Sequence, residues 1–252
     1  MVERVFCARV GRFVKDLGAL SPLEEQMNQP LEELTSSADR LYDAREQLAN
    51  VHTLVRYLEE AENTSEFEVA WRLGRALFFL GQEAQTEEEA RSYYARAVLV
   101  CNGASRVRPE RVEGHFWLGV NLALLARVET PFNALLEALR ARRSLMRAVR
   151  IDPGYHAAGP LRVLARLQHR LPRLLGGSTA RALRNFERAI AIAPQNTVTR
   201  YYLAEMMLEN GDETRARVEL EALMKAPRDP SWRFESTRDR ENARRMLDQL
   251  GR

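Results

Sequence analysis

Apolar residues recur along this chain at the three- and four-residue spacing of amphipathic helices, and no stretch alternates apolar and polar residues as a strand does. Thr86-Glu87-Glu88-Glu89 and Thr130-Pro131 each predict a helix start, because threonine caps free backbone amides and proline fits the first turn. Asn210-Gly211-Asp212 predicts a tight turn between two helices. The whole pattern predicts an all-α fold of roughly ten to twelve helices in antiparallel succession.

The helical pattern is itself repeated. Ala141, Leu145, Ala148 and Pro153 recur as Ala182, Phe186, Ala189 and Pro194 with every spacing kept. The preceding helices share a small residue after leucine, in the pairs Leu73-Gly74, Leu118-Gly119 and Leu203-Ala204. This combination is typical of tetratricopeptide repeats. We predict a superhelical array of helix hairpins that forms a single domain over residues 21–252, with units at about 66–102, 112–153, 156–194 and 197–228.

The repeat is irregular in three places. Only the last unit has the plain length of about 34 residues, and the others have insertions near residues 82–85, 127–138 and 168–178. The third unit also has Arg162-Val163 where the small-residue pair is expected. Since insertions on one face of a repeat array often determine what it binds, these segments are candidates for specificity.

The order of five segments resembles a known family more closely than a generic repeat does. They are residues 71–81 (WRLGRALFFLG), 112–122 (VEGHFWLGVNL), 151–156 (IDPGYH), 174–178 (LLGGS) and 193–197 (APQNT). From about Leu41 to the carboxyl end, the chain resembles the T component of bacterial tripartite ATP-independent periplasmic (TRAP) transporters. More loosely, it resembles the repeat region of regulator of microtubule dynamics proteins. The first resemblance implies a periplasmic repeat lipoprotein that forms trimers, associates with a substrate-binding subunit and handles hydrophobic ligands.

Residues 1–20 have the pattern of an amphipathic helix. Arg4, Arg9 and Arg12 interrupt its apolar side, so we expect no cleavable signal. Arg4-Val5-Phe6 before Cys7 does not resemble a lipid-attachment box. Docking of this helix on the protein's own core is favoured over contact with a membrane. The location stays open between the cytoplasm, which the missing signal indicates, and the periplasm, which would require a start further upstream.

Charge and motifs argue against several functions. The 38 basic and 35 acidic residues alternate and leave a net charge of +3, which disfavours a nucleic-acid binder. The four histidines are dispersed, the cysteines Cys7 and Cys101 form no pair motif, and zinc-site spacing is absent. Gly176-Gly177-Ser178 lacks the lysine of a phosphate loop and indicates a helix end followed by a cap. We therefore predict no enzyme, no metal and no cofactor.

A groove on the inner face of the array is the candidate site. The first helix of each repeat lines that face, and its phase places there Trp71, Arg75, Phe78, Phe116, Val120, Tyr201 and Glu205. Such a groove would be aromatic with few charges, which suits a partner protein or a hydrophobic small ligand. Packing between repeats is the alternative role for these rings. The expected function is a non-enzymatic binding scaffold, including an accessory role in TRAP-type uptake. The alternative is a self-assembling protein whose inserted helices form homo-oligomers.

Overall fold

The computed structural model describes residues 31–61 and 66–251, so the expected helix within residues 1–20 lies outside the described part. The described residues form eleven α-helices and two short 3-10 helices without any strand, which confirms the all-α repeat fold. The helices are α3 (Leu31–Asp43), α4 (Leu48–Glu59), α5 (Phe67–Glu83), α6 (Glu87–Val107), α7 (Val112–Leu125), α8 (Pro131–Ile151), α9 (Tyr155–Arg170), η1 (Arg173–Leu175), α10 (Thr179–Ile192), α11 (Thr197–Glu209), α12 (Glu213–Lys225), η2 (Pro230–Trp232) and α13 (Arg233–Leu250).

Side-chain caps fix where several of these helices begin. Thr86 accepts a hydrogen bond from the Glu89 amide at 3.1 Å, as the sequence predicted for the start of α6. Ser178, Asn196 and Asp212 cap α10, α11 and α12 in the same way. Since each cap satisfies an amide that has no partner within its helix, the short loops between helices are stabilised locally.

Small residues let the two helices of each hairpin approach closely. A Cβ atom on Gly74 of α5 would overlap Cys101 of α6, and one on Gly119 of α7 would lie 2.6 Å from Leu145 of α8. The alanines Ala97, Ala141, Ala148, Ala182, Ala189 and Ala216 of the second helices are fully buried. The repeated small residues are therefore the positions where α5–α6, α7–α8, α9–α10 and α11–α12 pack against each other.

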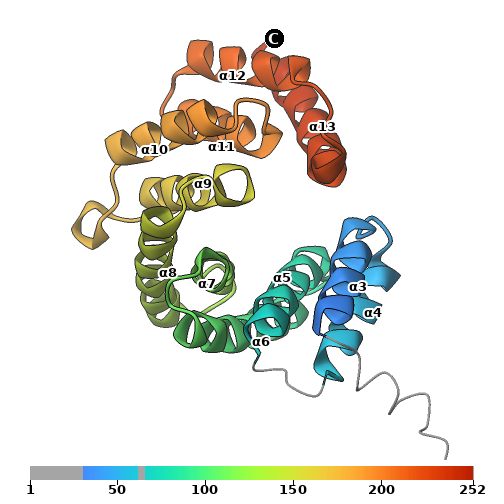
Figure 1. Cartoon of the computed structure of the whole chain (residues 1–252). Coiled ribbons are helices and arrows are strands. Elements are labelled where there is room, and N and C mark those ends of the chain that lie inside the picture. Colours follow the sequence, from blue (N-terminus) through green and yellow to red (C-terminus); the bar gives the residue numbers. More distant parts are fainter. Residues whose placement is uncertain (1–30, 62–65, 252) are drawn as a thin grey trace, which may run out of the picture.

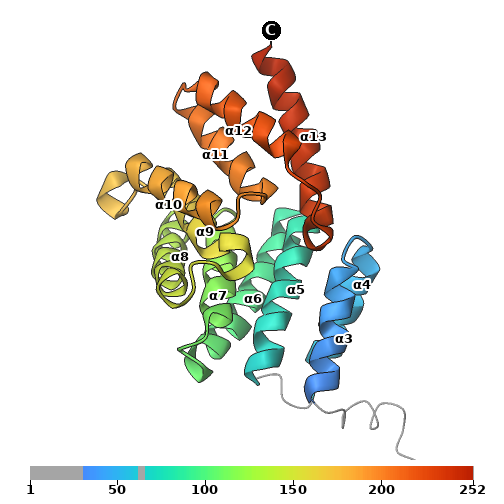
Figure 2. The same cartoon turned by 45° about the horizontal axis from the view of Figure 1, so that its top comes forward.

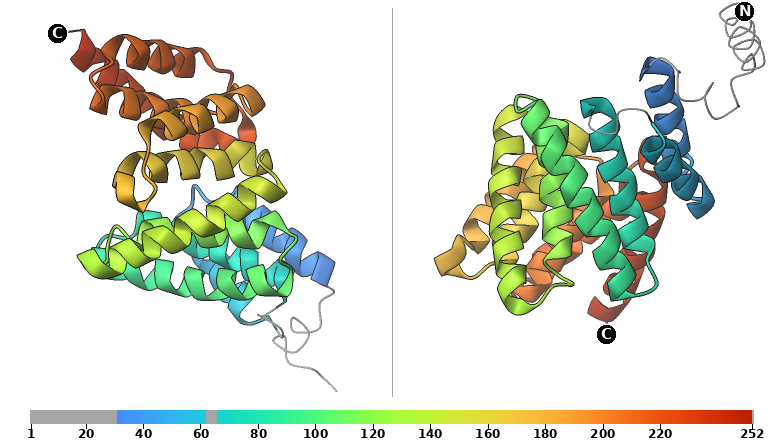
Figure 3. Two further views of the ribbon diagram at one scale, coloured as in Figure 1. Left: turned by 90° about the vertical axis from the view of Figure 1, so that its left-hand side faces the viewer. Right: turned by 90° about the horizontal axis from the view of Figure 1, so that it is seen from below.

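The hairpins wind into a superhelix that almost closes on itself. Figure 1 shows α5 to α12 following a curve, with α7 and α9 inside it and α8 outside. The same curve seen from another angle brings α13 beside α5 and toward the turn between α3 and α4 (Figure 2). Side and bottom views show the hairpins stacked in sequence order (Figure 3). The start of the last helix, α13, thus lies against the first helices of the described chain.

Candidate functional site

The inner face encloses a cavity of about 600 Å³. Its wall comes mainly from α5, α7 and α9, the first helices of three hairpins, and α11 of the fourth adds Val198 and Tyr202. Residues of η2 and α13 cover part of it, and α8 adds Ala134, Leu135 and Ala138 where it begins. Since small-molecule pockets usually measure about 300–1,000 Å³, the cavity has the size of a ligand site.

One part of the cavity wall is aromatic and apolar. Phe78, Phe116 and Trp117 line it, with ring centroids 5.4 Å apart for Phe78 and Trp117 and 4.9 Å apart for Phe116 and Trp117. Val120 and Leu124 extend the same surface along α7. A ligand that covered these side chains would remove apolar surface from water, and that favours binding without fixing orientation.

The rest of the wall is rich in arginine. Five arginines line the cavity, Arg127, Arg162, Arg166, Arg170 and Arg238, against two acids, Glu83 and Glu235. The expectation of few charges in the groove was therefore wrong. Arg127 and Arg170 lie within the insertions, where the repeat pattern does not say which residues face inward.

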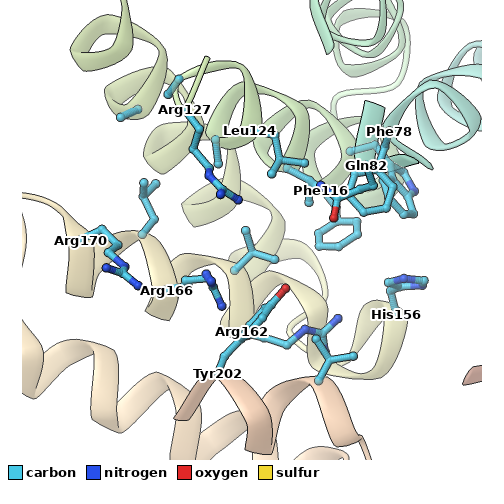
Figure 4. A pocket seen from close by; sticks show the side chains of 18 of the residues that line it. Phe78, Gln82, Phe116, Leu124, Arg127, His156, Arg162, Arg166, Arg170 and Tyr202 are labelled. Carbon is cyan, nitrogen blue, oxygen red and sulfur yellow. The ribbon is translucent and has the colours of Figure 1, made fainter. Parts of the chain in front are cut away.

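Three of these arginines gather at one side of the cavity. Figure 4 shows Arg127, Arg166 and Arg170 on the side away from Phe78 and Phe116. Arg166 pairs with Glu205 at 2.6 Å and Arg170 pairs with Glu209 at 2.6 Å. Within the described residues, the Arg127 guanidinium has neither an ion pair nor a hydrogen bond, although it lines the cavity. A ligand's anionic group could pair with Arg127 without breaking an existing ion pair, which is not true of Arg166 or Arg170.

Arg162 is a functional candidate that reasoning from the sequence did not select. It is buried, and it donates hydrogen bonds to the Ala157 carbonyl at 2.9 Å and to Asn196 Oδ1 and Thr199 Oγ1 at 3.3 Å. Burial lowers the pKa of Arg162 to about 10, so its guanidinium stays charged near neutral pH. The signal was present in the sequence, because this arginine stands where the repeat normally has a small-residue pair.

A left-handed turn positions the neighbouring ring of His156. His156, Ala157 and Ala158 have φ angles of 51°, 52° and 59°, a conformation that costs roughly 1–2 kcal/mol for each such residue. The turn places the His156 ring 5.2 Å from Trp117 and 4.7 Å from Trp232, between centroids. Strained backbone of this kind persists only where the surrounding packing holds it in place, and it is common at functional sites.

The carboxyl-terminal segment closes the array against its amino-terminal hairpin. Arg45, after α3, pairs with Glu235 of α13 at 2.8 Å and donates to the Ser231 carbonyl at 3.1 Å. Phe234 packs on Phe79 of α5 with centroids 5.2 Å apart. Arg233 and Glu46 add an exposed ion pair. We call this set of contacts the end closure; it covers the cavity with side chains from the segment that directly follows the last repeat.

The structure distributes the seven predicted groove residues over three environments. Phe78, Phe116 and Val120 line the cavity. Trp71 is buried in the core, where its Nε1 donates to Glu68, and Arg75 pairs with Asp39 at 2.6 Å and stacks over Tyr42. Tyr201 and Glu205 lie outside the cavity lining, while the adjacent Tyr202 belongs to it. Ligand contact stays a prediction for all seven.

Two polar groups in α7 contact backbone carbonyls. Asn121 donates to the carbonyls of Trp117 at 2.8 Å and Gly74 at 3.2 Å, which ties α7 to α5. His115 contacts the Pro109 carbonyl at 3.0 Å. Within residues 31–61 and 66–251, no cluster of three or more His, Cys, Asp or Glu side chains is arranged to hold a metal ion.

The environment of His156 makes stability depend on pH. Burial lowers the pKa of His156 well below its usual value, and Arg162, Arg75 and Arg45 lower it further. Below about pH 6.5 the unfolded chain takes up a proton that the folded chain excludes, so stability falls as pH drops through that value. We expect His156→Gln to remove up to about 1.4 kcal/mol of the stability change between pH 7.5 and 5.5. Urea unfolding at both pH values measures it, with the exposed His52→Gln as control; equal pH dependence in His156→Gln and the wild-type chain would contradict it.

Comparison with known proteins assigns the chain to a family. Residues 174–233 match a tetratricopeptide repeat model, and no curated protein sequence matches the chain significantly. A thermophilic tetratricopeptide repeat protein from Thermus thermophilus has a similar crystal structure, with a TM-score of 0.61 at 21% identity over 82% of this chain and 97% of that one. At this identity the likeness shows the fold alone. The TRAP T-component resemblance stays a prediction. Residues 34–159, half of the chain, match the model described as regulator of microtubule dynamics protein 1-3, and the chain belongs to that family.

Proposed function

We propose that this protein is a non-enzymatic binding protein whose cavity holds an elongated, mainly apolar ligand with an anionic group. Its tetratricopeptide-type repeats belong to a fold that generally mediates protein–protein interaction. The observation that favours a small ligand is the division of the cavity into an aromatic side and an arginine side. An amphiphile placed with its acid near Arg127 and its apolar part near Phe116 would match both.

The end closure favours a small ligand over a partner helix. A helix with its side chains is about 10–12 Å across, and a groove that received one would need to be open along its length. Here Trp232 and Phe234 lie over the inner face and line the cavity. A partner protein would have to displace this segment first, whereas a slender ligand would not.

Two variants test the cavity with a fluorescent long-chain fatty acid as the probe. We expect Leu124→Trp to weaken binding at least about tenfold, because the indole would occupy space beside the aromatic side. Arg127→Glu should weaken it by about 10- to 100-fold, since a charge-assisted hydrogen bond contributes roughly 1.5–3 kcal/mol. Fluorescence titration of each purified full chain measures both effects.

Matched controls separate the cavity from general damage. Ala95→Trp adds the same ring on an exposed position of α6 and should leave the affinity unchanged. A fatty alcohol that competes for the same site should bind Arg127→Glu as well as it binds the wild-type chain, because it has no charge to pair. Equal fatty-acid affinity in Leu124→Trp and wild type would refute the cavity as the site.

Two assignments from the sequence remain proposals beside this one. An accessory role in TRAP-type uptake would use the same cavity, since that family is expected to handle hydrophobic ligands. If the insertion at 127–138 forms homo-oligomers, the cavity would have no part in the function. The mass of the full chain in solution, measured across a concentration series, tests the second assignment directly.

A further inference from the structure

Three strongly exposed apolar side chains lie beside the arginine side of the cavity. They are Phe132 and Leu136 at the start of α8, 73% and 46% exposed, and Leu174 of η1, which is fully exposed. Their immediate neighbours Leu135 and Leu175 line the cavity, so both segments border its rim. Both views of Figure 3 place the start of α8 and the gold-coloured η1 at the same end of the molecule. We call these three side chains the apolar rim.

The charge on the η1 side of the apolar rim is one-sided. On the α8 side, Glu129 and Glu137 are already paired with Arg91 and Arg140. Between Asp152 and Glu187 the sequence has six arginines and not one acidic residue. Within the described part of the chain, Arg173 and Arg184 are exposed and have no ion pair, and Arg181 donates only to the Gly176 carbonyl. Over the longer stretch from 138 to 186, Asp152 is the one acidic residue, whereas the whole sequence has 35 acidic residues against 38 basic ones.

We propose that the apolar rim and the arginines around it form a docking surface for an anionic lipid bilayer. Projecting apolar side chains flanked by arginines are what an interfacial membrane contact requires, because the side chains enter the acyl boundary while the cations meet anionic headgroups. A bilayer accepts a fully exposed leucine without a complementary pocket. The contact is peripheral, since no helix in residues 31–61 and 66–251 has the length and hydropathy of a membrane span.

A second copy of the chain fits this surface less well. A two-fold contact would bring the same patch of both copies together, and the patch is basic on each. The acid-free stretch from 153 to 186 offers no carboxylate to pair with the partner's arginines, and Glu129 and Glu137 on the α8 side already pair within the chain. Like charges placed opposite each other oppose association, so charge complementarity favours the bilayer.

Vesicle flotation of the full chain tests the proposal. Vesicles of phosphatidylcholine alone are compared with vesicles containing about a third phosphatidylserine, at physiological salt. We expect binding to the anionic vesicles only. Phe132→Ser with Leu174→Asp should reduce it at least about tenfold, and Arg173→Glu with Arg184→Glu at least about 25-fold, since each cation near such a surface contributes about a fivefold factor.

The controls change exposed residues away from the rim. Leu99→Asp alters a leucine that is 74% exposed on α6. Arg106→Glu with Arg244→Glu gives the same net charge as the arginine test pair on exposed positions of α6 and α13. Both should bind vesicles as the wild-type chain does. Equal losses in test and control variants would overturn the proposal, and so would an absence of binding to anionic vesicles.

Further readouts separate this proposal from its alternatives. Rim variants that lower the mass of an oligomer without any vesicle binding in the wild type would identify a self-association surface and overturn the proposal. Fatty-acid titration without vesicles should be unaffected by Leu174→Asp, because Leu174 does not line the cavity. The docking surface goes beyond the proposed function, and either one can fail while the other stands.

Discussion

Replacing Ala189 by arginine is expected to leave the chain largely unfolded at 25 °C. Ala189 of α10 is fully buried and packs with Ala158 and Leu161 of α9. An arginine there would place an unpaired charge in a close helix contact, at a cost of several kcal/mol beyond the overpacking. Domains of this size have a total stability of about 5–15 kcal/mol, so one such change can exhaust it.

Ala191→Arg is the matched control for this prediction. Ala191 is exposed on the same helix, so the same side chain can reach water, and the effect should stay within about 0.5 kcal/mol. Far-ultraviolet circular dichroism and urea unfolding of both variants measure the difference. A folded Ala189→Arg chain whose unfolding midpoint equals that of the control would show that the α9–α10 contact can open without consequence.

Glu235→Ala is expected to release the end closure at a cost of about 3–5 kcal/mol to that contact. Arg45 is buried, and its partner Glu235 is largely shielded from water, so the truncation leaves a charge without its carboxylate. The hairpins far from the closure do not depend on this pair. We therefore expect faster amide hydrogen exchange in α13 and α3, with the centre of the array little changed.

Two comparisons make the closure prediction specific. Arg233→Ala removes the exposed pair with Glu46 and should cost less than about 1 kcal/mol. The double variant Arg45→Met with Glu235→Leu replaces the buried pair by apolar side chains and should recover most of the protection. Similar exchange rates in Glu235→Ala and Arg233→Ala would mean that the buried pair does not hold the closure.

The repeat pattern predicted most of the fold because the small residues at helix contacts recur at recognisable positions in the sequence. Gly74, Gly119 and Ala189 recur at fixed phase, and each is a place where helices touch. The same phase placed Phe78 and Phe116 on the inner face, where the structure has them. On α11 the predicted phase differs from the cavity lining by one residue, because Tyr202 lines the cavity and Tyr201 does not. One residue on a helix is a rotation of about 100°, so a small error in phase changes the face.

The arginine side and the end closure were not predictable in this way. Arg127 and Arg170 lie in insertions that have no equivalent in other repeats. Arg45 and Glu235 are 190 residues apart, and they meet only because small rotations accumulate over several hairpins. Neither local helix propensity nor the repeat period shows how these rotations between hairpins add up. The unusual Arg162 was visible in the sequence, but its meaning depended on knowing which side chains surround it.

The end closure also changes the order in which the chain is expected to unfold. In an open solenoid each repeat touches only its neighbours, so the terminal repeats fray first and unfolding spreads inward. Here the final helix α13 shares an interface with the α3–α4 hairpin and α5 through Arg45, Glu235 and Phe234. Fraying at either end must break that interface, which couples the two termini and raises cooperativity. The closing contact is also the one of highest sequence separation, so its loop entropy should make it a late step in folding.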